Sequence, residues 1–252
     1  MGEQEGAAAQ PGVLEAAWLG RAGYAHMWAW QRRRFEARRA DECNDMVVLL
    51  EHPPTYTLGR RSTPDEILYT PEQRRALGIS LFEVDRGGRA TYHGPGQIVG
   101  YPIVALGHRY DVLQYLRGIE DALIGVLAEV EIEGHRDPRH TGVWVGDNKI
   151  AAIGVRITRG ITMHGFALNV GTDLSMFEGI VPCGIEDHWV TSVEAETGAY
   201  HRLDDVALRL GRHLARVMNR TLQWDSCRVV HKGWYATTNH HSASLSREKA
   251  ST

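Results

Sequence analysis

The sequence predicts an α+β fold: a single domain in which helices flank a central mixed or mostly antiparallel sheet. Three segments carry apolar residues at helical spacing, and groups of short strand patterns joined by turns lie between them. Hairpin-linked strands interrupted by long helices are typical of such a sheet. The 252 residues suffice for a sizeable core, and no repeat or shift in composition marks an interior linker.

Each expected helix has its own signal. In the first, over residues 24–35, one face is apolar except for a glutamine, and the arginines of this region lie largely elsewhere. The second runs from about Asp111 to Val130, with Asp111 as its N-cap, and the third from about Asp204 to Asn219.

The strand signals are apolar runs bounded by turn residues. Asp147-Asn148 and Arg159-Gly160 are turn signals that join the last three strands into hairpins. A small appendage after about residue 200 is the alternative to one undivided domain. The expected strands cover residues 46–51, 81–85, 90–93, 97–105, 141–146, 149–157 and 161–170.

Both ends of the chain look loose, so we expect a leader over residues 1–12, a folded domain over 13–235 and a tail over 236–252. The leader has no basic or apolar region and is no signal peptide, and no apolar run reaches membrane length. We therefore expect a cytoplasmic protein. The net charge of −3 excludes strong bulk attraction to nucleic acid or anionic membranes.

The chain has three cysteines, Cys43, Cys183 and Cys227, and an odd number without a CxxC motif makes no disulfide framework. We expect a reducing compartment, with each cysteine either a small hydrophobe or a working thiol. Histidines at 93, 140 and 164 match no compact zinc spacing with Cys183, so no metal site is predicted. A GxSxG serine motif is also absent.

The densest candidate motif is RGGRATYHGPGQ over residues 86–97. Its four glycines let the backbone approach a ligand closely, and arginine, tyrosine and histidine side chains are interleaved with them. Neither GxxxxGK[ST] nor GxGxxG before a helix is present, so a phosphate cradle is not indicated. A pair of strand turns without any ligand is the other interpretation.

Two single residues are candidates for chemistry. Lys149 follows a polar turn and begins an apolar strand, where a lysine is either a solvated end or an inward, partly desolvated acid and base. Cys183 lies in a Pro-Cys-Gly turn, which a substrate reaches more easily than a strand or helix. A nearby cation such as Lys149 would lower the pKa of this thiol. Cys43 and Cys227 are expected to be inert.

Four segments together resemble the lipoyl(octanoyl) transferase family of lipoate biosynthesis, octanoyl-acyl carrier protein:protein N-octanoyltransferase. The resemblance extends over most of the chain, from about residue 14 to residue 220, in the family's order. It implies a fold like that of biotin- and lipoate-protein ligases, with 13–235 as catalytic domain. The segments are RGGRATYHGPGQIVGYPI (86–103), GVWVGDNKIAAIGVRI (142–157), HGFALNV (164–170) and GIVPCGI (179–185).

The resemblance also implies a reaction, the first step of protein lipoylation. Acyl carrier protein would donate an octanoyl (or lipoyl) group to the nucleophile Cys183. Lys149 would serve as acid and base and lower the pKa of Cys183. The implied substrate-binding residues are Arg86, Gly87, Gly88, Arg89, Ala90, Thr91, Tyr92, His93, Ala152, Ile153, Gly154, Gly165, Phe166 and Ala167.

The implied acceptors are lysines in the lipoyl domains of 2-oxoacid dehydrogenase E2 subunits and in the glycine cleavage H protein. No cofactor, nucleic acid or membrane is implied, and a monomer is expected. Since acyl carrier protein is acidic, arginines of the first helix are candidates for steering it, against the simpler interpretation of a solvated helix face. These arginines are Arg32, Arg33, Arg34, Arg38 and Arg39.

Two alternatives remain. An ATP-dependent lipoate-protein ligase of the same fold needs no catalytic cysteine, and its glycine-rich motif continues with an acidic residue and an asparagine. This chain continues instead with residues 94–97, Gly-Pro-Gly-Gln. A non-catalytic module that binds a lipoyl domain or an acyl chain is the second alternative, and the presence of both Cys183 and Lys149 argues against it.

Overall fold

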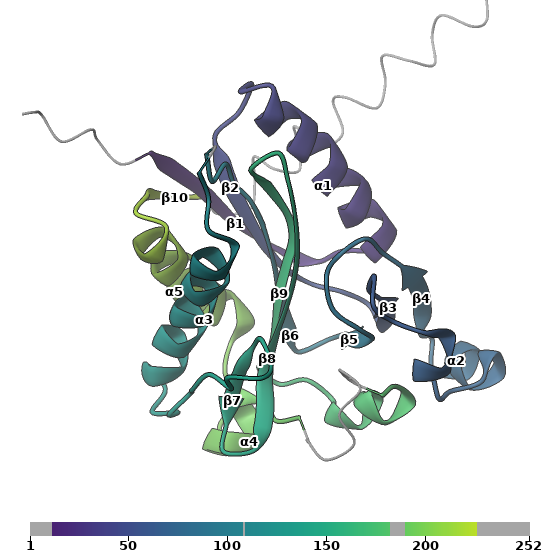
Figure 1. The fold of residues 1–252 in the computed structure, drawn as a ribbon. Coiled ribbons are helices and arrows are strands. Elements are labelled where there is room, and N and C mark those ends of the chain that lie inside the picture. The colour runs from purple at the N-terminus through teal and green to yellow at the C-terminus, as the bar shows by residue number, and fades with distance from the viewer. Residues whose placement is uncertain (1–11, 108, 182–189, 226–252) are drawn as a thin grey trace, which may run out of the picture.

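The computed structural model describes residues 12–107, 109–181 and 190–225. Its main sheet has the order β10-β1-β2-β6-β9-β8-β7 (Figure 1). β1 pairs in parallel with both β10 and β2, and every other pair in this sheet is antiparallel, as expected for a mixed sheet. The strands are β1 (Val13–Arg21), β2 (Asp45–Glu51), β6 (Gln97–Ile103), β7 (Val143–Val145), β8 (Asn148–Thr158), β9 (Ile161–Asn169) and β10 (Thr221–Asp225).

A second, three-stranded sheet of order β4-β3-β5 lies beside the first (Figure 1). Its strands are β3 (Thr55–Leu58), β4 (Ser80–Glu83) and β5 (Thr91–His93), and short helical segments η1 (Pro64–Glu66) and α2 (Pro71–Ala76) connect β3 to β4. The glycine-rich motif therefore starts as a loop between β4 and β5 and continues into β6.

Three long helices cover the main sheet. α3 (Val112–Ala128) and α5 (Leu203–Val217) pack together on one face, and α1 (Tyr24–Arg39) packs on the other (Figure 1). Asp111 caps α3 by accepting hydrogen bonds from the backbone N–H groups of Leu113 and Gln114, which confirms the predicted N-cap. Short η2 (Leu174–Gly179) and α4 (Val193–Thr197) follow β9.

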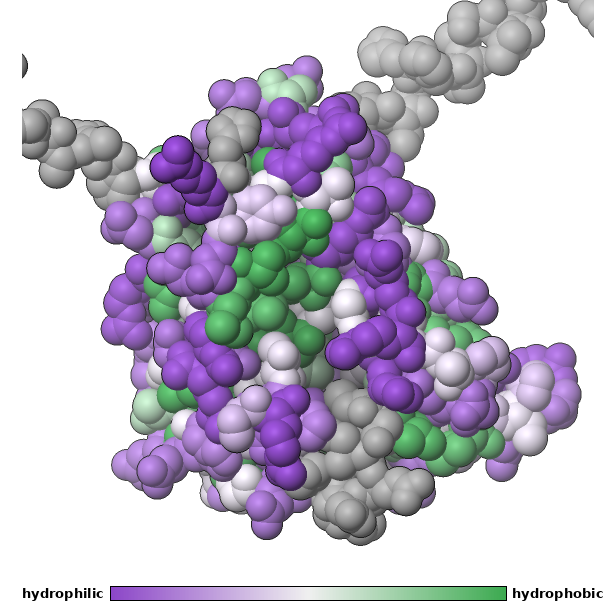
Figure 2. All heavy atoms as spheres, viewed as in Figure 1, coloured by the Kyte–Doolittle hydropathy of each residue, from purple (hydrophilic) through white to green (hydrophobic). Residues whose placement is uncertain are grey.

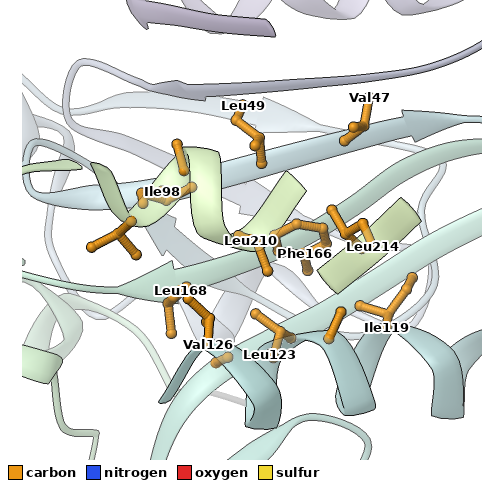
Figure 3. Packing of buried hydrophobic residues seen from close by; sticks show 14 of the residues in the cluster. Val47, Leu49, Ile98, Ile119, Leu123, Val126, Phe166, Leu168, Leu210 and Leu214 are labelled. Carbon is orange, nitrogen blue, oxygen red and sulfur yellow. The ribbon is translucent and has the colours of Figure 1, made fainter. Parts of the chain in front are cut away.

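Side-chain alternation along β2 explains why its sequence is a continuous apolar run. Val47 and Leu49 join the cluster under α3 and α5, whereas Val48 and Leu50 join the cluster under α1. Figure 3 shows Val47 and Leu49 with the labelled residues of β6, β9, α3 and α5. A strand with a helix layer on each face has no polar side. The same two layers enclose β6 and β9, whose register with β8 is given by continuous antiparallel pairing.

The C-terminal region is part of the main sheet, so the alternative of an appendage after residue 200 is wrong. α5 packs on α3 and β1, and β10 pairs with β1 along its full length. β1, β3, β10, α2 and α4 were not predicted, because short or partly polar segments lack a clear period. The expected leader and tail lie outside the described residues, apart from Gly12. In the part of the chain that is described, no helix is both long and apolar enough to span a membrane.

Candidate active site

A pocket opens where the start of α1, the loop before β5, and strands β6, β8 and β9 meet. It encloses about 560 Å³ of space, its open mouth included. Most of the predicted substrate-binding residues line this pocket. The fold therefore brings together segments that are far apart in the sequence. These residues are Arg86, Gly88, Arg89, Ala90, Thr91, His93, Ala152, Ile153, Gly154, Gly165, Phe166 and Ala167.

The two other predicted residues, Gly87 and Tyr92, are not among the lining residues. Tyr92 lies on the opposite side of β5 from His93 and packs against Tyr56 and Phe177, with ring centroids 5.8 and 5.5 Å away. The Gly87 N–H donates to the Val155 carbonyl at 2.9 Å, which fastens the loop to β8. Both residues therefore support the wall of the pocket from behind.

Close backbone contacts explain the glycines that lie opposite the loop, and a positive φ explains one glycine within it. A Cβ atom at Gly154 would lie 2.9 Å from the Gly87 carbonyl oxygen, and one at Gly59 would lie 2.5 Å from the Gly88 oxygen. Gly88 itself has a φ of +90°, in the region that favours glycine. The loop between β4 and β5 thus lies directly against β8 and β3, where no larger residue fits.

Lys149 lies near the start of β8 and lines the pocket with only 9 % of its surface exposed. Its Nζ atom is 4.7 Å from the centroid of the buried Trp144 ring, a cation–π contact across the β7–β8 hairpin. The fold therefore turns Lys149 inward, as the functional interpretation of the sequence requires.

Cys183 and Cys227 both lie outside the described residues. The described residues on either side of the segment 182–189, which contains Cys183, are held beside the pocket. The Val181 N–H donates to the Glu66 carbonyl at 2.8 Å. The other side is held by Lys149, whose backbone bridges to Val190 and accepts a hydrogen bond from the Thr191 N–H at 3.0 Å. The segment 182–189 thus leaves and rejoins the described structure next to residues of the site.

Glu66 joins this segment to the glycine-rich loop. Its carboxylate, 4 % exposed, accepts a hydrogen bond from the Ala90 N–H at 2.8 Å and pairs with the Arg89 guanidinium at 2.9 Å. Both partners line the pocket, and the Glu66 backbone holds Val181. One buried residue therefore holds two parts of the site, the glycine-rich loop through its carboxylate and the chain before the Cys183 segment through its backbone carbonyl.

A chain of hydrogen bonds sets the orientation of His93. Nδ1 of His93 donates to the side-chain oxygen of Gln97 at 2.8 Å, and the Gln97 amide donates to Asn169 at 2.9 Å. Asn169 in turn donates to the Thr191 carbonyl at 3.0 Å. Burial, followed by repulsion from His52, lowers the pKa of His93 to about 3, so the ring is neutral near pH 7 and its Nε2 is an acceptor.

An aromatic group from α1, β6 and the chain after β2 packs around the His93 ring. His52 donates through Nδ1 to the Ala22 carbonyl at 2.6 Å and accepts from the Tyr101 hydroxyl at 2.7 Å. Burial lowers the pKa of His52 to about 4. The Tyr24 ring stacks 6.0 Å from the His93 ring, centroid to centroid. This aromatic group is itself uncharged at neutral pH. The charged Arg86 lines the same pocket, and its buried guanidinium donates to the Thr57 carbonyl at 2.8 Å.

His164 occupies a kink of β9 with a φ of +57°. Its N–H donates to the buried Gln31 side chain at 2.8 Å, which gives the polar interruption on α1 a structural role. The ring lines the pocket and donates to Asp85 at 2.7 Å. That hydrogen bond, with the charge of Arg156, lowers the pKa of Asp85 to about 2, so Asp85 is ionised.

No group of three or more potential metal ligands is found among the residues that the structure describes. Cys43 lies away from the pocket, in a groove with Arg38 and Asp45, and burial raises the pKa of its thiol. That Cys43 is inert stays a prediction.

Five lining residues were not predicted to bind substrate, although His164 had been considered as a metal ligand. Their side chains meet the glycine-rich loop only once the segments are folded together, so no spacing in the chain marks them as lining residues. The additional lining residues are Tyr24, Val99, Tyr101, Thr141 and His164.

Comparisons with known proteins agree with this architecture. Residues 23–215 match the family described as the lipoyl protein ligase A/B catalytic domain. An octanoyltransferase of Rubrobacter xylanophilus is 52 % identical over 177 residues, which are 69 % of this chain and 80 % of that protein. An octanoyltransferase of Chloroflexus aggregans is 47 % identical over 205 residues, 80 % of this chain and 93 % of that protein.

Solved structures with the same fold include a lipoate-protein ligase A bound with ATP. It has a TM-score of 0.70 at 17 % identity, over 89 % of this chain and 92 % of that one. A bi-partite lipoate protein ligase from Thermoplasma acidophilum has a TM-score of 0.68 at 17 % identity, over 89 % and 90 % of the two chains. The chain belongs to the lipoyl protein ligase A/B family and, by its similarity to relatives of known name, to the octanoyltransferases within it.

Proposed function

We propose that this chain transfers an octanoyl (or lipoyl) group from acyl carrier protein to a lysine of a lipoyl domain, through a thioester on Cys183. The observation that carries the proposal is the position of Lys149. It lines the pocket formed by the glycine-rich loop, β6, β8 and β9, and its backbone holds Val190 and Thr191, the described residues that follow the Cys183 segment. An acyl chain in the pocket would present its carbonyl group at the mouth, beside Lys149 and that segment.

In the first step, the Cys183 sulfur attacks the carbonyl carbon of the octanoyl thioester, and Lys149 accepts the thiol proton. The bond from that carbon to the carrier's sulfur breaks, and the departing thiolate takes the proton back from Lys149. In the second step, the amine of the acceptor lysine attacks the acyl-enzyme and gives a proton to Lys149. The Cys183 thiolate leaves and is protonated again, and the product is an amide.

The energetics of this sequence need no ATP. Exchange of one thioester for another is nearly balanced, and conversion of a thioester to an amide is downhill. Each buried methylene of the acyl chain contributes about 0.8 kcal/mol, so a linear eight-carbon chain is held by several kcal/mol without any polar group. The uncharged side chains of His93 and Tyr101 line the pocket together with the apolar side chains of Val99, Phe166 and Ala167, and these fit that requirement.

The proposed acceptors are the lipoyl domains of 2-oxoacid dehydrogenase E2 subunits and the glycine cleavage H protein. We further propose a cytoplasmic monomer. The reducing cytoplasm keeps a catalytic thiol available. Neither a resident cofactor nor a nucleic acid or membrane takes part in the proposed reaction.

The test is incubation of the chain with octanoyl acyl carrier protein in the absence of ATP, followed by mass spectrometry. We expect a covalent adduct of about 126 Da on the peptide that contains Cys183. The Cys183→Ala variant should form no adduct and transfer nothing, while Cys43→Ala, the matched control, should behave as the unchanged chain does. An absolute requirement for ATP and free acid, without any adduct, would show a ligase instead.

A further inference from the structure

The charge of the arginine-rich helix α1 is reduced by ion pairs. Three of its five arginines pair with neighbouring carboxylates. Arg32, which lies over the Trp28 ring at 4.7 Å, and Arg33 are both exposed and keep their charges, but neither lines the pocket. The ion pairs are Arg34–Glu15, Arg38–Asp45 and Arg39–Glu36, at 2.8, 2.8 and 2.6 Å.

Two other arginines lie at the edge of the pocket itself. The Arg60 N–H donates to the Arg86 carbonyl at 3.0 Å, and the Arg61 N–H donates to the Gly88 carbonyl at 3.1 Å. These backbone bonds fasten both residues to the loop that lines the pocket. Both are exposed, and neither forms an ion pair with a residue in the described ranges. The rim therefore carries two uncompensated positive charges.

We propose that Arg60 and Arg61 form the docking surface for the acidic protein that carries the octanoyl group. This inference rests on the proposed function. The acyl group hangs from a long flexible arm, so the chain enters the pocket while the body of the carrier stays outside and touches the rim. Uncompensated charges at that point raise the local concentration of an acidic partner and orient its arm toward the mouth.

Figure 2 shows an apolar patch on this face of the molecule, bordered by strongly hydrophilic side chains. On β8, Ile153, Val155 and Ile157 are partly exposed and pack against the cluster under α3 and α5. The inference therefore rests on the charged rim: arginine binds carboxylates through a two-pronged contact, which suits an acidic protein surface.

The experiment compares the double variant Arg60→Glu/Arg61→Glu with the unchanged chain in the first half-reaction. Acylation of Cys183 is followed by mass spectrometry with three donors: octanoyl acyl carrier protein, octanoyl-phosphopantetheine and octanoyl-pantetheine. We expect kcat/KM for the carrier protein to fall about tenfold or more at low salt, through KM, and its salt dependence to flatten. Rates with the two small donors should stay unchanged.

The matched control is Arg32→Glu/Arg33→Glu, which changes the net charge equally on α1 and should leave all three donors unaffected. An equal loss in both double variants would show that only net charge matters and would overturn the proposal. A slower reaction with octanoyl-phosphopantetheine would also overturn the proposal, because it would assign the arginines to the phosphate group. A loss confined to the second step, transfer onto the lipoyl domain, would overturn it as well. If the unchanged chain is not acylated at all, the proposed function fails instead.

Discussion

The ammonium group of Lys149 lies over the face of the buried Trp144 ring, with Nζ 4.7 Å from the ring centroid. The two residues sit opposite each other in the β7–β8 hairpin, and Trp144 is 2 % exposed. A ring fixed in the core thus restricts where the end of a long, flexible side chain can lie. In the proposed reaction this contact positions the acid and base.

Replacement of Trp144 should therefore slow transfer through Lys149. A cation–π contact away from water is worth about 2 kcal/mol, so Trp144→Leu should lower the single-turnover rate by about thirtyfold. Trp144→Phe keeps a smaller aromatic face and should retain most of the rate. Urea unfolding of both variants separates loss of packing from loss of positioning. Equal rates for the Leu and Phe variants, at comparable stability, would contradict this role.

Glu66 should affect activity more than stability. Glu66→Gln replaces one carboxylate oxygen by an NH₂ group, which faces either the Ala90 N–H or the Arg89 guanidinium. Both of those groups are hydrogen-bond donors, as is NH₂, so one buried hydrogen bond of the Glu66 side chain is lost. The cost is about 2 kcal/mol at the junction of the loop and the Cys183 segment. We expect at least a tenfold slower acylation from octanoyl-pantetheine.

The control for Glu66 is Glu72→Gln on α2. Glu72 pairs with Arg75 at 2.7 Å on an exposed surface, and such pairs contribute little. Acylation and the urea midpoint should stay close to those of the unchanged chain. A Glu66 variant with normal acylation would mean that this carboxylate stabilises the fold without positioning the site.

The parts of the fold that the sequence predicted are those in which local pattern and tertiary environment agree. β2 is apolar throughout because a helix layer covers each of its faces, and Asp111 marks the start of α3 through its own side chain. β1 was missed because its buried positions, Leu14, Ala16 and Ala17, do not alternate strictly. β10 is a short strand that only its pairing with β1 defines.

The site divides in the same way. The glycines at 88 and 154 were recognisable, since a positive φ at Gly88 and the close approach of the Gly87 carbonyl to Gly154 both favour glycine and leave a mark in the sequence. Glu66 and His52 carry no such mark. Each is an ordinary polar residue until the fold buries it against partners that lie far away in the chain, such as Arg89 or Tyr101.

The buried histidines should make the fold sensitive to mild acid. Burial lowers the pKa of His52 to about 4, so between pH 6.5 and 4 the unfolded chain binds a proton that the folded protein does not. Stability therefore falls as the pH falls through this window, and His52 accounts for about 3 kcal/mol of the loss. Above pH 6.5 it contributes no pH dependence.

Urea unfolding of His52→Gln at several pH values measures this contribution. The variant also loses the hydrogen bonds of His52, so its absolute stability is not informative. The slope of the unfolding free energy against pH is, because it reports the number of protons taken up on unfolding. Between pH 6.5 and 4 this number should be smaller by about one in His52→Gln than in the unchanged chain. His26→Gln, at an exposed position, is the control and should keep the full slope. Parallel curves for the unchanged chain and His52→Gln would mean that His52 does not resist protonation in the fold.

Val99 should help to set the length of acyl chain that the pocket accepts. It is 1 % exposed, lies on β6 opposite Ala167 of β9, and lines the pocket beside Tyr101. Val99→Ala removes two methyl groups and opens space in the pocket. Two further methylenes contribute about 1.6 kcal/mol, so preference for a ten-carbon over an eight-carbon donor should rise by up to about fifteenfold.

Competition between octanoyl and decanoyl donors measures this preference directly, and Val48→Ala supplies the control. Val48 is buried in the same cluster under α1 but does not line the pocket. Both variants delete the same atoms from the core and should lose about 2 kcal/mol of stability. Because only Val99 faces the acyl chain, only Val99→Ala should favour the longer donor. An equal shift in both variants would trace the change in preference to a loosened core rather than to the shape of the pocket.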